Sequence, residues 1–367
     1  KIFYMKKNLQ RAFKKLIQIL FKSIYGQILY LNNNNKKLQI EKKISKNKIF
    51  EGKKYFTYKI KKGIIYTDNV QHVAIISGNH LHGPSSFQHI KDKLVKPKSN
   101  VVLEKGTPRI RKKFDGTVLS LAQGASGENY FHWLMDILPK LKICMENYNL
   151  NKINYFYLPN LWNSQIESLS LLGIKKNKFI NSKFNRHIIA DEIISITHPW
   201  YTKGRVHDQA NKMPKWIIVW IKNTFLKFKK KFQISKKIFL DRSDSKYQHC
   251  QIINYQEIKK YLKSKKFQYI KSNKLSFTKQ IYLFWNADYI VGAHGAAFAN
   301  LVFCKPKTKV IEIRPSINPN SINERISYIN KLNYRLIQTK ELDENQKKFG
   351  DIYLPIKELE HCIKSFG

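Results

Sequence analysis

The sequence predicts an α/β fold of two Rossmann-like domains that face a cleft, preceded by a basic amphipathic helix. Three observations carry this prediction. The chain has 367 residues, too many for one compact core and suitable for two domains. Its apolar runs alternate between strand-like and helix-like periodicity over two separate stretches. Hydrophobic residues make up 43% of the chain, which is enough to build a core in each domain.

Residues 1–50 are a basic N-terminal segment. Within residues 1–62, 18 lysines and arginines stand against only Glu41 and Glu51. Apolar side chains recur there at spacings of three and four, which predicts one apolar helical face with basic residues between them. Such a face fits equally a helix docked on the protein's own core and a helix lying on an anionic membrane. The apolar set is Phe13, Leu16, Ile17, Leu20, Phe21, Ile24, Ile28 and Leu31, and the basic set is Arg11, Lys14, Lys15 and Lys22.

Residues 51–215 are predicted to form the first Rossmann-like domain. Four apolar runs have the length and composition of buried strands, at 70–77, 117–122, 154–158 and 187–195. The segments 129–148 and 164–172 have helical periodicity. Strands that alternate with helices predict a mostly parallel sheet covered by helices.

Residues 216–345 are predicted to form the second Rossmann-like domain. An aromatic and basic helix at 216–232 precedes an alternating unit that has the order of a doubly wound nucleotide-binding sheet. Residues 346–367 are predicted to pack back across both domains. The expected strands are 237–240, 267–270, 289–291 and 309–313, the expected helices are 256–263, 278–285, one starting near 295, 320–330 and 357–365, and 334–337 and 351–353 are expected to be extended.

The net charge is the unusual feature of the composition. Lysine and arginine number 68 against 25 aspartates and glutamates, a formal charge of +43. Such a charge favours a polyanionic partner, either nucleic acid or an anionic membrane surface. The basic residues are scattered rather than gathered on one stripe, and lysine, asparagine and isoleucine are abundant together, which compositional drift also explains.

Four cysteines lie far apart, without a CxxC pair or zinc spacing, and no run of about 18 apolar residues occurs. We therefore expect a cytoplasmic protein, peripheral on the inner face of the plasma membrane if the basic helix binds lipid. The chain starts at Lys1 rather than at methionine, so the sequence leaves open whether an anchor precedes it. The cysteines are Cys144, Cys250, Cys304 and Cys362.

The turn Gly292-Ala293-His294-Gly295-Ala296 is the first candidate site. A buried strand ends in small residues and gives way to a helix, whose positive end would attract an anion. We expect the two glycines to let a ligand approach the backbone, and His294 to donate to a phosphate or sugar oxygen. Two glycines in such a turn also occur for geometry alone.

A second candidate site opens a predicted helix. A Gly/Ser loop leads into Glu128 and Asn129, and His132 and Asp136 follow at a spacing of four. That spacing places them on one helical face, where the carboxylate can orient the imidazole of a general base. A structural histidine with a satisfied partner fits the pattern as well, and a metal pair lacks a third ligand nearby.

A third candidate site follows the first strand of the second domain. There Arg242 could neutralise a diphosphate and Ser243 could donate to it, at the edge where α/β sheets bind ligands. A polar turn with a surface ion pair is the alternative. Glu312 stands inside an apolar strand, where a carboxylate needs a partner, and ribose or sugar hydroxyls would serve.

These segments, in this order, resemble the signatures of family 61 glycosyltransferases over about residues 115–315. The resemblance implies a GT-B fold, inversion at the anomeric carbon and nucleotide-sugar donors, typically UDP-linked. The sequence departs from the family at Ala297, Ala299 and the Pro306-Lys307 turn, which bears on donor preference. The resembling residues are Asn129-Tyr130-Phe131-His132-Trp133-Leu134, Asp136, Leu138-Pro139, Arg242-Ser243-Asp244, Val291-Gly292-Ala293-His294-Gly295-Ala296, Asn300, Phe303, Pro306 and Val310-Ile311-Glu312.

The resemblance leads to one mechanism. His132, oriented by Asp136, deprotonates an acceptor hydroxyl in the N-terminal domain, where Glu128 and Asn129 bind the glycan or lipid-linked acceptor. The donor site comprises Arg242, Ser243, Gly292, His294, Gly295, Ala296, Asn300 and Glu312. No cofactor is expected, and no metal is needed if these groups carry the charge. The rivals are a nucleic-acid-binding protein, for which no motif appears, and a phosphotransferase, for which GxxxxGK[ST] is absent.

Overall fold

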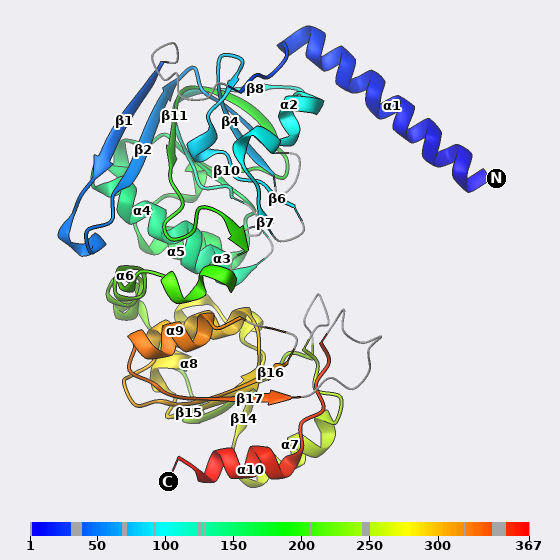
Figure 1. Cartoon of the computed structure of the whole chain (residues 1–367). Coiled ribbons are helices and arrows are strands. Elements are labelled where there is room, and N and C mark those ends of the chain that lie inside the picture. The colour runs from blue at the N-terminus through cyan, green and yellow to red at the C-terminus, as the bar shows by residue number, and fades with distance from the viewer. Residues whose placement is uncertain are drawn as a thin grey trace. The chain divides into compact units, whose positions relative to one another are not determined.

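The computed structural model describes residues 2–30, 39–67, 72–90, 93–123, 127, 129–205, 207–243, 250–316, 318, 320–339 and 350–366 (Figure 1). The side chains of residues 2–7 are not described. The chain divides into two compact units, Lys1–Val206 and His207–Gly367. The predicted boundary was at 215/216, so residues 207–215, which we expected in the first domain, belong to the second unit.

Among its described residues, the first unit contains a nine-stranded mixed sheet and a small three-stranded one. The order of the large sheet is β10-β9-β8-β11-β3-β4-β5, with β2 also paired to β11 and β1 to β2. Its strands are β1 (Ile40–Ser45), β2 (Tyr55–Lys61), β3 (Ile64–Thr67), β4 (Val73–Ser77), β5 (His80–Leu81), β8 (Lys112–Ser120), β9 (Tyr155–Leu158), β10 (Phe179–Asn181) and β11 (His187–Ile196). The small sheet contains β6 (His89–Ile90), β7 (Lys93–Leu94) and β12 (Gly204–Arg205).

The first unit departs from the mostly parallel sheet that we predicted. The pairs β10–β9, β9–β8 and β8–β11 are parallel. Every pair that involves one of the strands β1 to β5 is antiparallel. The reason is the length of the connections: β1 and β2, and then β3, β4 and β5, follow one another too closely for the crossover that parallel strands need. Strands β2 and β3 lie one after the other along β11. The predicted strand at 70–77 is therefore an antiparallel neighbour of β3, and its residues 70 and 71 lie outside the described residues.

Helices connect the parallel strands of the first unit. The chain passes from β8 to β9 through one helical run and from β9 to β10 through α5, as the alternating pattern predicted. A buried cluster on this sheet includes Ile65, Val118, Tyr157 and Ile193. The helices are α1 (Ile2–Tyr25), α2 (Val101–Lys105), α3 (Tyr130–His132), the π-helix η5 (Trp133–Ile137), α4 (Leu138–Met145) and α5 (Asn163–Leu171).

The second unit has a parallel sheet of order β14-β13-β15-β16-β17. The strand order reverses between β13 and β15, the switch point at which doubly wound sheets bind ligands. This is the predicted arrangement. The strands are β13 (Lys237–Leu240), β14 (Gln268–Ile270), β15 (Tyr289–Ala293), β16 (Lys309–Pro315) and β17 (Asn333–Thr339). The helices are α6 (Lys215–Phe225), α7 (Tyr255–Ser264), α8 (Phe277–Asn286), α9 (Ile322–Ile329) and α10 (Ile356–Lys364).

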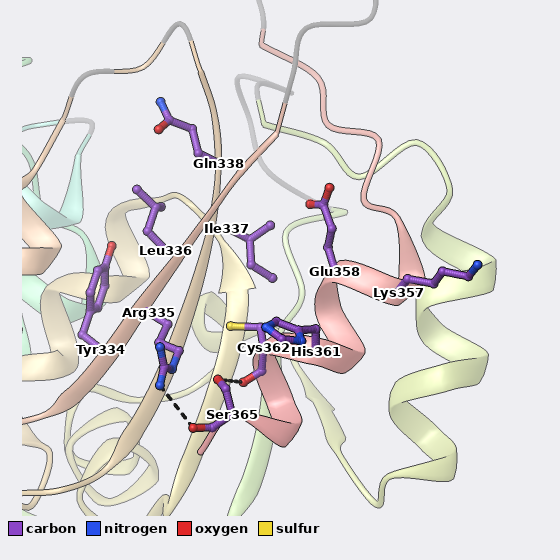
Figure 2. A pocket seen from close by; sticks show the side chains of 10 residues that line it. All are labelled: Tyr334, Arg335, Leu336, Ile337, Gln338, Lys357, Glu358, His361, Cys362 and Ser365. Atoms are coloured by element: carbon purple, nitrogen blue, oxygen red, sulfur yellow. Dashed lines mark hydrogen bonds between the residues drawn. The ribbon is translucent and has the colours of Figure 1, made fainter. Parts of the chain in front are cut away.

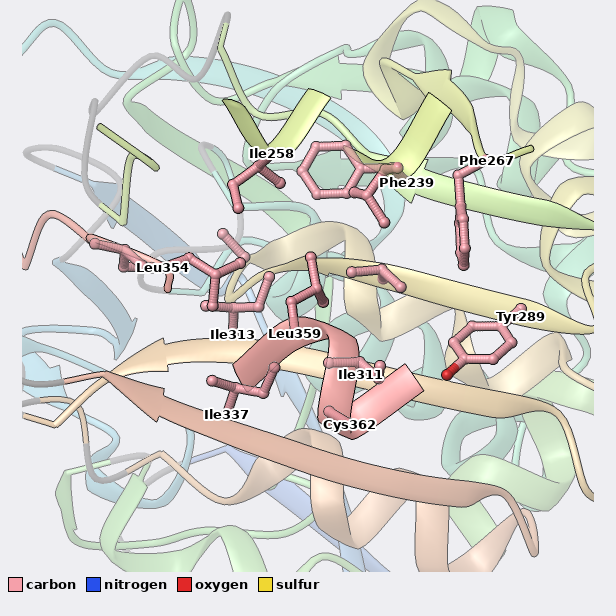
Figure 3. Packing of buried hydrophobic residues seen from close by; sticks show 14 of the residues in the cluster. Phe239, Ile258, Phe267, Tyr289, Ile311, Ile313, Ile337, Leu354, Leu359 and Cys362 are labelled. Atoms are coloured by element: carbon pink, nitrogen blue, oxygen red, sulfur yellow. The ribbon is translucent and has the colours of Figure 1, made fainter. Parts of the chain in front are cut away.

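The C-terminal segment completes the core of the second unit. Figure 3 shows α10 placing Leu359 and Cys362 against Ile311 and Ile337 of the sheet, within a cluster that also includes Phe239. Helix α10 contacts α7 and β17. These contacts lie inside the second unit, and packing of the segment across both domains stays a prediction.

Helix α1 ends at Tyr25, whereas the predicted apolar periodicity continued to Leu31: Ile28 lies beyond the helix and is buried, and Leu31 lies outside the described residues. In the part of the chain that the structure describes, no helix has both the length and the apolar character required to cross a membrane.

Candidate functional site

The sequence around Pro139 shapes the helix that carries the first candidate site. Proline has no N–H to donate to the Met135 carbonyl, and its ring crowds that carbonyl. The Leu138 amide, one residue before the proline, donates to the Trp133 carbonyl five residues back. This longer step widens the helix into the π-helix η5. Short π-helical turns are frequent at functional sites. Here the turn carries Asp136.

His132 and Asp136 form the pair that their spacing predicted. His132 Nδ1 lies 2.7 Å from Asp136 Oδ2. The Asp136 side chain is completely buried, and the His132 side chain is 14% exposed. Because an ionised carboxylate can only accept, Nδ1 donates and Nε2 keeps its lone pair. Asp136 therefore fixes the His132 ring through Nδ1, and Nε2 is the ring nitrogen that can accept a proton.

Two further side chains hold Asp136. The Trp200 indole donates from Nε1 to Asp136 Oδ1 at 2.8 Å, and His198 Nε2 lies 3.5 Å from Oδ2. Burial raises the pKa of Asp136, but the hydrogen bond from His132 and the attraction of His132 and His198 outweigh burial and bring the pKa well below its usual range. Burial lowers the pKa of His198 to about 4, against the attraction of Asp136. Asp136 is thus an ionised anchor for His132.

Lys140 places a cation in the same buried region. Its residue is only 2% exposed, and Nζ lies 4.8 Å from the centre of the Phe87 ring. Burial lowers the pKa of Lys140 to about 7, and the attraction of Asp136 opposes this shift. Lys140 therefore titrates near neutral pH, next to the carboxylate that orients His132.

The structure describes one of the two residues that we predicted to bind the acceptor. Asn129 caps the start of α3, where its Oδ1 accepts from the Phe131 amide at 2.9 Å. The cap uses Asn129 Oδ1, and acceptor binding by this residue stays a prediction. Glu128 lies outside the described residues.

His294 and Glu312 form a second histidine–carboxylate pair, in the second unit. His294 lies just past β15, and its Nδ1 is hydrogen-bonded to Glu312 of the adjacent strand β16. The Glu312 side chain is completely buried, and the His294 side chain is 13% exposed. Asn323 Nδ2 donates to Glu312 Oε1 at 3.0 Å, and the Tyr334 hydroxyl donates to Oε2. Two residues that were predicted separately thus meet through their side chains.

These bonds change the role of Glu312. Burial raises its pKa, but the hydrogen bonds and charge of His294, with the bond from Tyr334, lower the pKa below its usual value. We had expected ribose or sugar hydroxyls to satisfy this carboxylate. Because three protein side chains already do so inside the unit, Glu312 orients His294 instead of binding a ligand directly.

Arg242 packs against Gly295. A Cβ on Gly295 would overlap the Arg242 guanidinium, so only glycine permits this approach. Burial lowers the pKa of Arg242, and Cys250 opposes the shift. At Gly292, a Cβ would lie 2.9 Å from Leu240 Cβ. We had expected both glycines to make room for a ligand; the structure shows that they make room for an arginine and for strand packing.

A cavity of about 190 Å³ lies at the switch point of the second sheet. Leu240 and Ala293, at the carboxyl ends of β13 and β15, line it together with Arg242, Ser243 and Tyr255. This is the edge at which the topology predicts ligand binding. Arg242 and Ser243 thus line a hollow at the edge where they were predicted to lie, and Asp244 lies outside the described residues.

The segment after Gly295 differs from the α-helix that we predicted. Residues Ala296–Phe303 form a 3₁₀-helix, η11. The His294 amide donates to the Ile313 carbonyl at 2.8 Å and so belongs to the sheet. Asn300 is completely buried, and its Nδ2 donates to Gln280 Oε1 at 3.0 Å. Asn300 therefore supports η11 and is not exposed to a donor, contrary to our prediction, whereas Ala296 is partly exposed beside His294.

A second hollow of about 630 Å³ lies between β17 and α10 (Figure 2). Arg335 and Ser365 on its wall bond to each other, with Nη2 donating to the Ser365 carbonyl at 3.1 Å. His361 is exposed on α10. Tyr334 also lines the hollow, but its hydroxyl donates to Glu312. None of the predicted site residues lines this hollow.

Sequence reasoning missed the residues that hold the two carboxylates. Their signals were weak: His198 and Trp200 follow the end of a buried strand, which is a typical place for site residues. Tyr334 opens an ordinary strand, and Asn323 lies on an ordinary helix. Their roles depend on contacts with distant parts of the chain.

The comparisons with known proteins agree with the motif order. The family model described as Glycosyltransferase 61 matches residues 130–311, which includes His132, Asp136, Arg242 and His294. No curated protein matches the sequence significantly. The match gives no support to the nucleic-acid-binding alternative.

Proposed function

This chain is a member of glycosyltransferase family 61 and hence an enzyme, and on this premise we propose that it is an inverting transferase with a nucleotide-sugar donor, UDP-linked. The acceptor that we propose is a glycan or lipid-linked sugar in surface polysaccharide synthesis. We also propose a GT-B-type division of labour, with acceptor chemistry in the first unit and donor binding in the second. The observation that carries the proposal is the His132–Asp136 pair, a partly exposed imidazole held by a buried carboxylate.

His132 acts as the general base. Nδ1 donates to Asp136, so the lone pair on Nε2 takes the proton of the acceptor hydroxyl. The acceptor oxygen then forms a bond to the anomeric carbon as the bond from that carbon to the donor diphosphate breaks. Attack from the face opposite the leaving group inverts the configuration. Asp136 stabilises the imidazolium that results.

His294, Arg242 and Ser243 bind the departing nucleotide diphosphate. With Nδ1 bonded to Glu312, a protonated His294 presents Nε2–H as a charged donor, and Glu312 balances that charge. Arg242 adds a second cation beside Gly295. Cations at the leaving group stabilise the charge that develops in the transition state. We therefore propose that transfer needs no metal ion, so that EDTA leaves the rate unchanged.

A donor panel tests this proposal. The purified chain is incubated with UDP-, GDP- and CMP-sugars, and the released nucleotide is measured together with the anomeric configuration of the released sugar by proton NMR. We expect turnover of a UDP-sugar with inversion. His132→Ala should abolish turnover while calorimetry shows donor binding retained.

His361→Ala is the matched control, because His361 is exposed on α10 and outside both pairs. Both turnover and donor binding should survive this change. Normal turnover by His132→Ala would disprove the base assignment, and retention of configuration would disprove the mechanism.

A further inference from the structure

Helix α1 presents an unpartnered apolar face. Every described side chain from Asn8 to Leu16 is exposed. Five large apolar side chains of α1 recur at spacings of three and four, so they share one side of the helix, and Ile19, which is 65% exposed, flanks them. We call these five the α1 stripe: Leu9 (76% exposed), Phe13 (63%), Leu16 (65%), Leu20 (55%) and Ile24 (58%).

The opposite side of α1 is cationic. At 100° per residue, its four described basic side chains lie on the face away from the α1 stripe. Residues 1–40 contain no aspartate or glutamate. An apolar stripe backed by cations alone complements an anionic lipid surface, where acyl chains bury the stripe and headgroups attract the cations. The basic residues are Arg11, Lys14, Lys15 and Lys22.

The C-terminal end of α1 is fixed to the first unit. The Tyr25 hydroxyl accepts from the Arg111 amide at 3.1 Å, and the Arg111 guanidinium lies 4.2 Å from the Tyr25 ring centre. The Tyr25 ring also meets the His187 ring edge-on at 5.1 Å. A helix held at its last turn and exposed over its earlier turns can dock elsewhere without disturbing the core.

We propose that α1 is a peripheral membrane anchor that lies on an anionic bilayer with the α1 stripe in the interface. The anchor holds the enzyme at a lipid surface without spanning it. This proposal does not depend on the transfer reaction, because it concerns a surface that the two histidine–carboxylate pairs do not use.

Vesicle co-sedimentation of the full chain tests the proposal. We expect binding to vesicles of phosphatidylcholine and phosphatidylglycerol at 3:1 and at least about 10-fold weaker binding to pure phosphatidylcholine. Leu16→Gln with Leu20→Gln keeps charge and helix propensity and should weaken binding to the anionic vesicles by about 30-fold or more. Arg11→Gln, Lys14→Gln and Lys15→Gln together should weaken it by a similar factor.

The matched control changes apolar side chains that are equally exposed elsewhere in the first unit. Ile110 and Phe184 are 76% and 74% exposed, and Ile110→Gln with Phe184→Gln should leave vesicle binding unchanged. Binding that survives the Leu16/Leu20 change and disappears in high salt would show attraction by net charge alone and overturn the proposal. A fall in particle mass for that variant without lipid would identify a second copy of the chain as the occupant, and would overturn it as well.

Discussion

The two units each contain a histidine held by a buried carboxylate, and the two pairs differ in how the chain builds them. His132 and Asp136 are four residues apart on one helical run. His294 and Glu312 are 18 residues apart and meet across the adjacent strands β15 and β16. Both carboxylates are completely buried and both histidines are about 13–14% exposed. The same local device has therefore arisen from a helix in one unit and from a parallel sheet in the other.

The surroundings of the two histidine–carboxylate pairs favour different chemical roles. Aromatic rings surround the first carboxylate, including Trp200, which donates to it. The second pair lies beside Gly295, against which the Arg242 guanidinium packs, at the edge of a parallel sheet where its topology predicts ligand binding. A histidine that a buried carboxylate orients through Nδ1 suits a general base, and a pair beside an arginine suits the binding of a diphosphate. Removing either carboxylate should therefore have different kinetic consequences.

The largest effect is expected at Asp136. Asp136→Asn keeps the size of the side chain, but because Trp200 donates to Oδ1, the amide NH2 takes the place of Oδ2 and faces His132 Nδ1, which favours the wrong tautomer. We expect kcat to fall by about 10³-fold or more, with the donor Kd unchanged. Glu312→Gln should act mainly on donor binding, by about 10- to 100-fold. Steady-state kinetics and calorimetry on both variants measure this contrast, and equal effects on kcat would contradict the division of labour.

Acid should destabilise the first unit through its buried histidines. Burial lowers the pKa values of His82, His187 and His198 to about 4. Because the unfolded chain binds protons at about 6.5, stability is full above pH 6.5 and falls as pH drops toward 4, by up to about 3 kcal/mol for each histidine. Urea unfolding between pH 7 and 4.5, with amide exchange to assign the unit, measures the loss.

His187→Gln sharpens this test. His187 Nδ1 donates to the Arg109 carbonyl at 2.8 Å, and Nε2 accepts from Arg111 Nε at 3.0 Å, a bond that protonation would break. The variant should show a shallower dependence of stability on pH, whereas His361→Gln should keep the wild-type slope. An unchanged slope in His187→Gln would show that this histidine does not contribute to acid sensitivity.

Substitutions of Gly292 and Gly295, at the proposed donor site, should separate effects on nucleotide binding from effects on folding. Gly295→Ala displaces Arg242, so nucleotide binding should weaken by about 10-fold while stability changes little. Gly292→Ala pushes β15 against Leu240 and should cost about 1–3 kcal/mol of unfolding free energy. Nucleotide titration measures the loss of binding in both variants, and urea unfolding measures their loss of stability. Tight nucleotide binding by Gly295→Ala would remove Arg242 from the donor site.

The smallest expected effect concerns the turn where the sequence departs from its family. Lys307 has a φ of 66°, a conformation that glycine adopts more easily. Lys307→Gly should stabilise the second unit by about 0.5 kcal/mol without changing turnover. Lys260→Gly, in the exposed middle of α7, should destabilise it by about 1 kcal/mol. Urea unfolding should give opposite signs for the two changes, and a loss of stability in Lys307→Gly would contradict the reading of this turn.

The sequence by itself predicted the elements whose periodicity is long and whose partners are near. It placed the five-stranded unit and the helical run around His132 close to their observed bounds, whereas the predicted apolar periodicity of α1 continued past the observed end at Tyr25. It also predicted the His132–Asp136 pair, because a helix brings residues four apart together wherever it forms. The antiparallel strands between residues 40 and 67 were not predicted, because short strands with mixed polarity give little periodic signal.

Only the tertiary structure decided what the candidate residues touch. Glu312 and His294 were both singled out, but their contact depends on which strands are neighbours in the sheet. Trp200 and Asn323 hold the two carboxylates from segments 64 and 11 residues away along the chain. A buried charge must find donors wherever the fold brings them, and neither local propensity nor spacing encodes that choice.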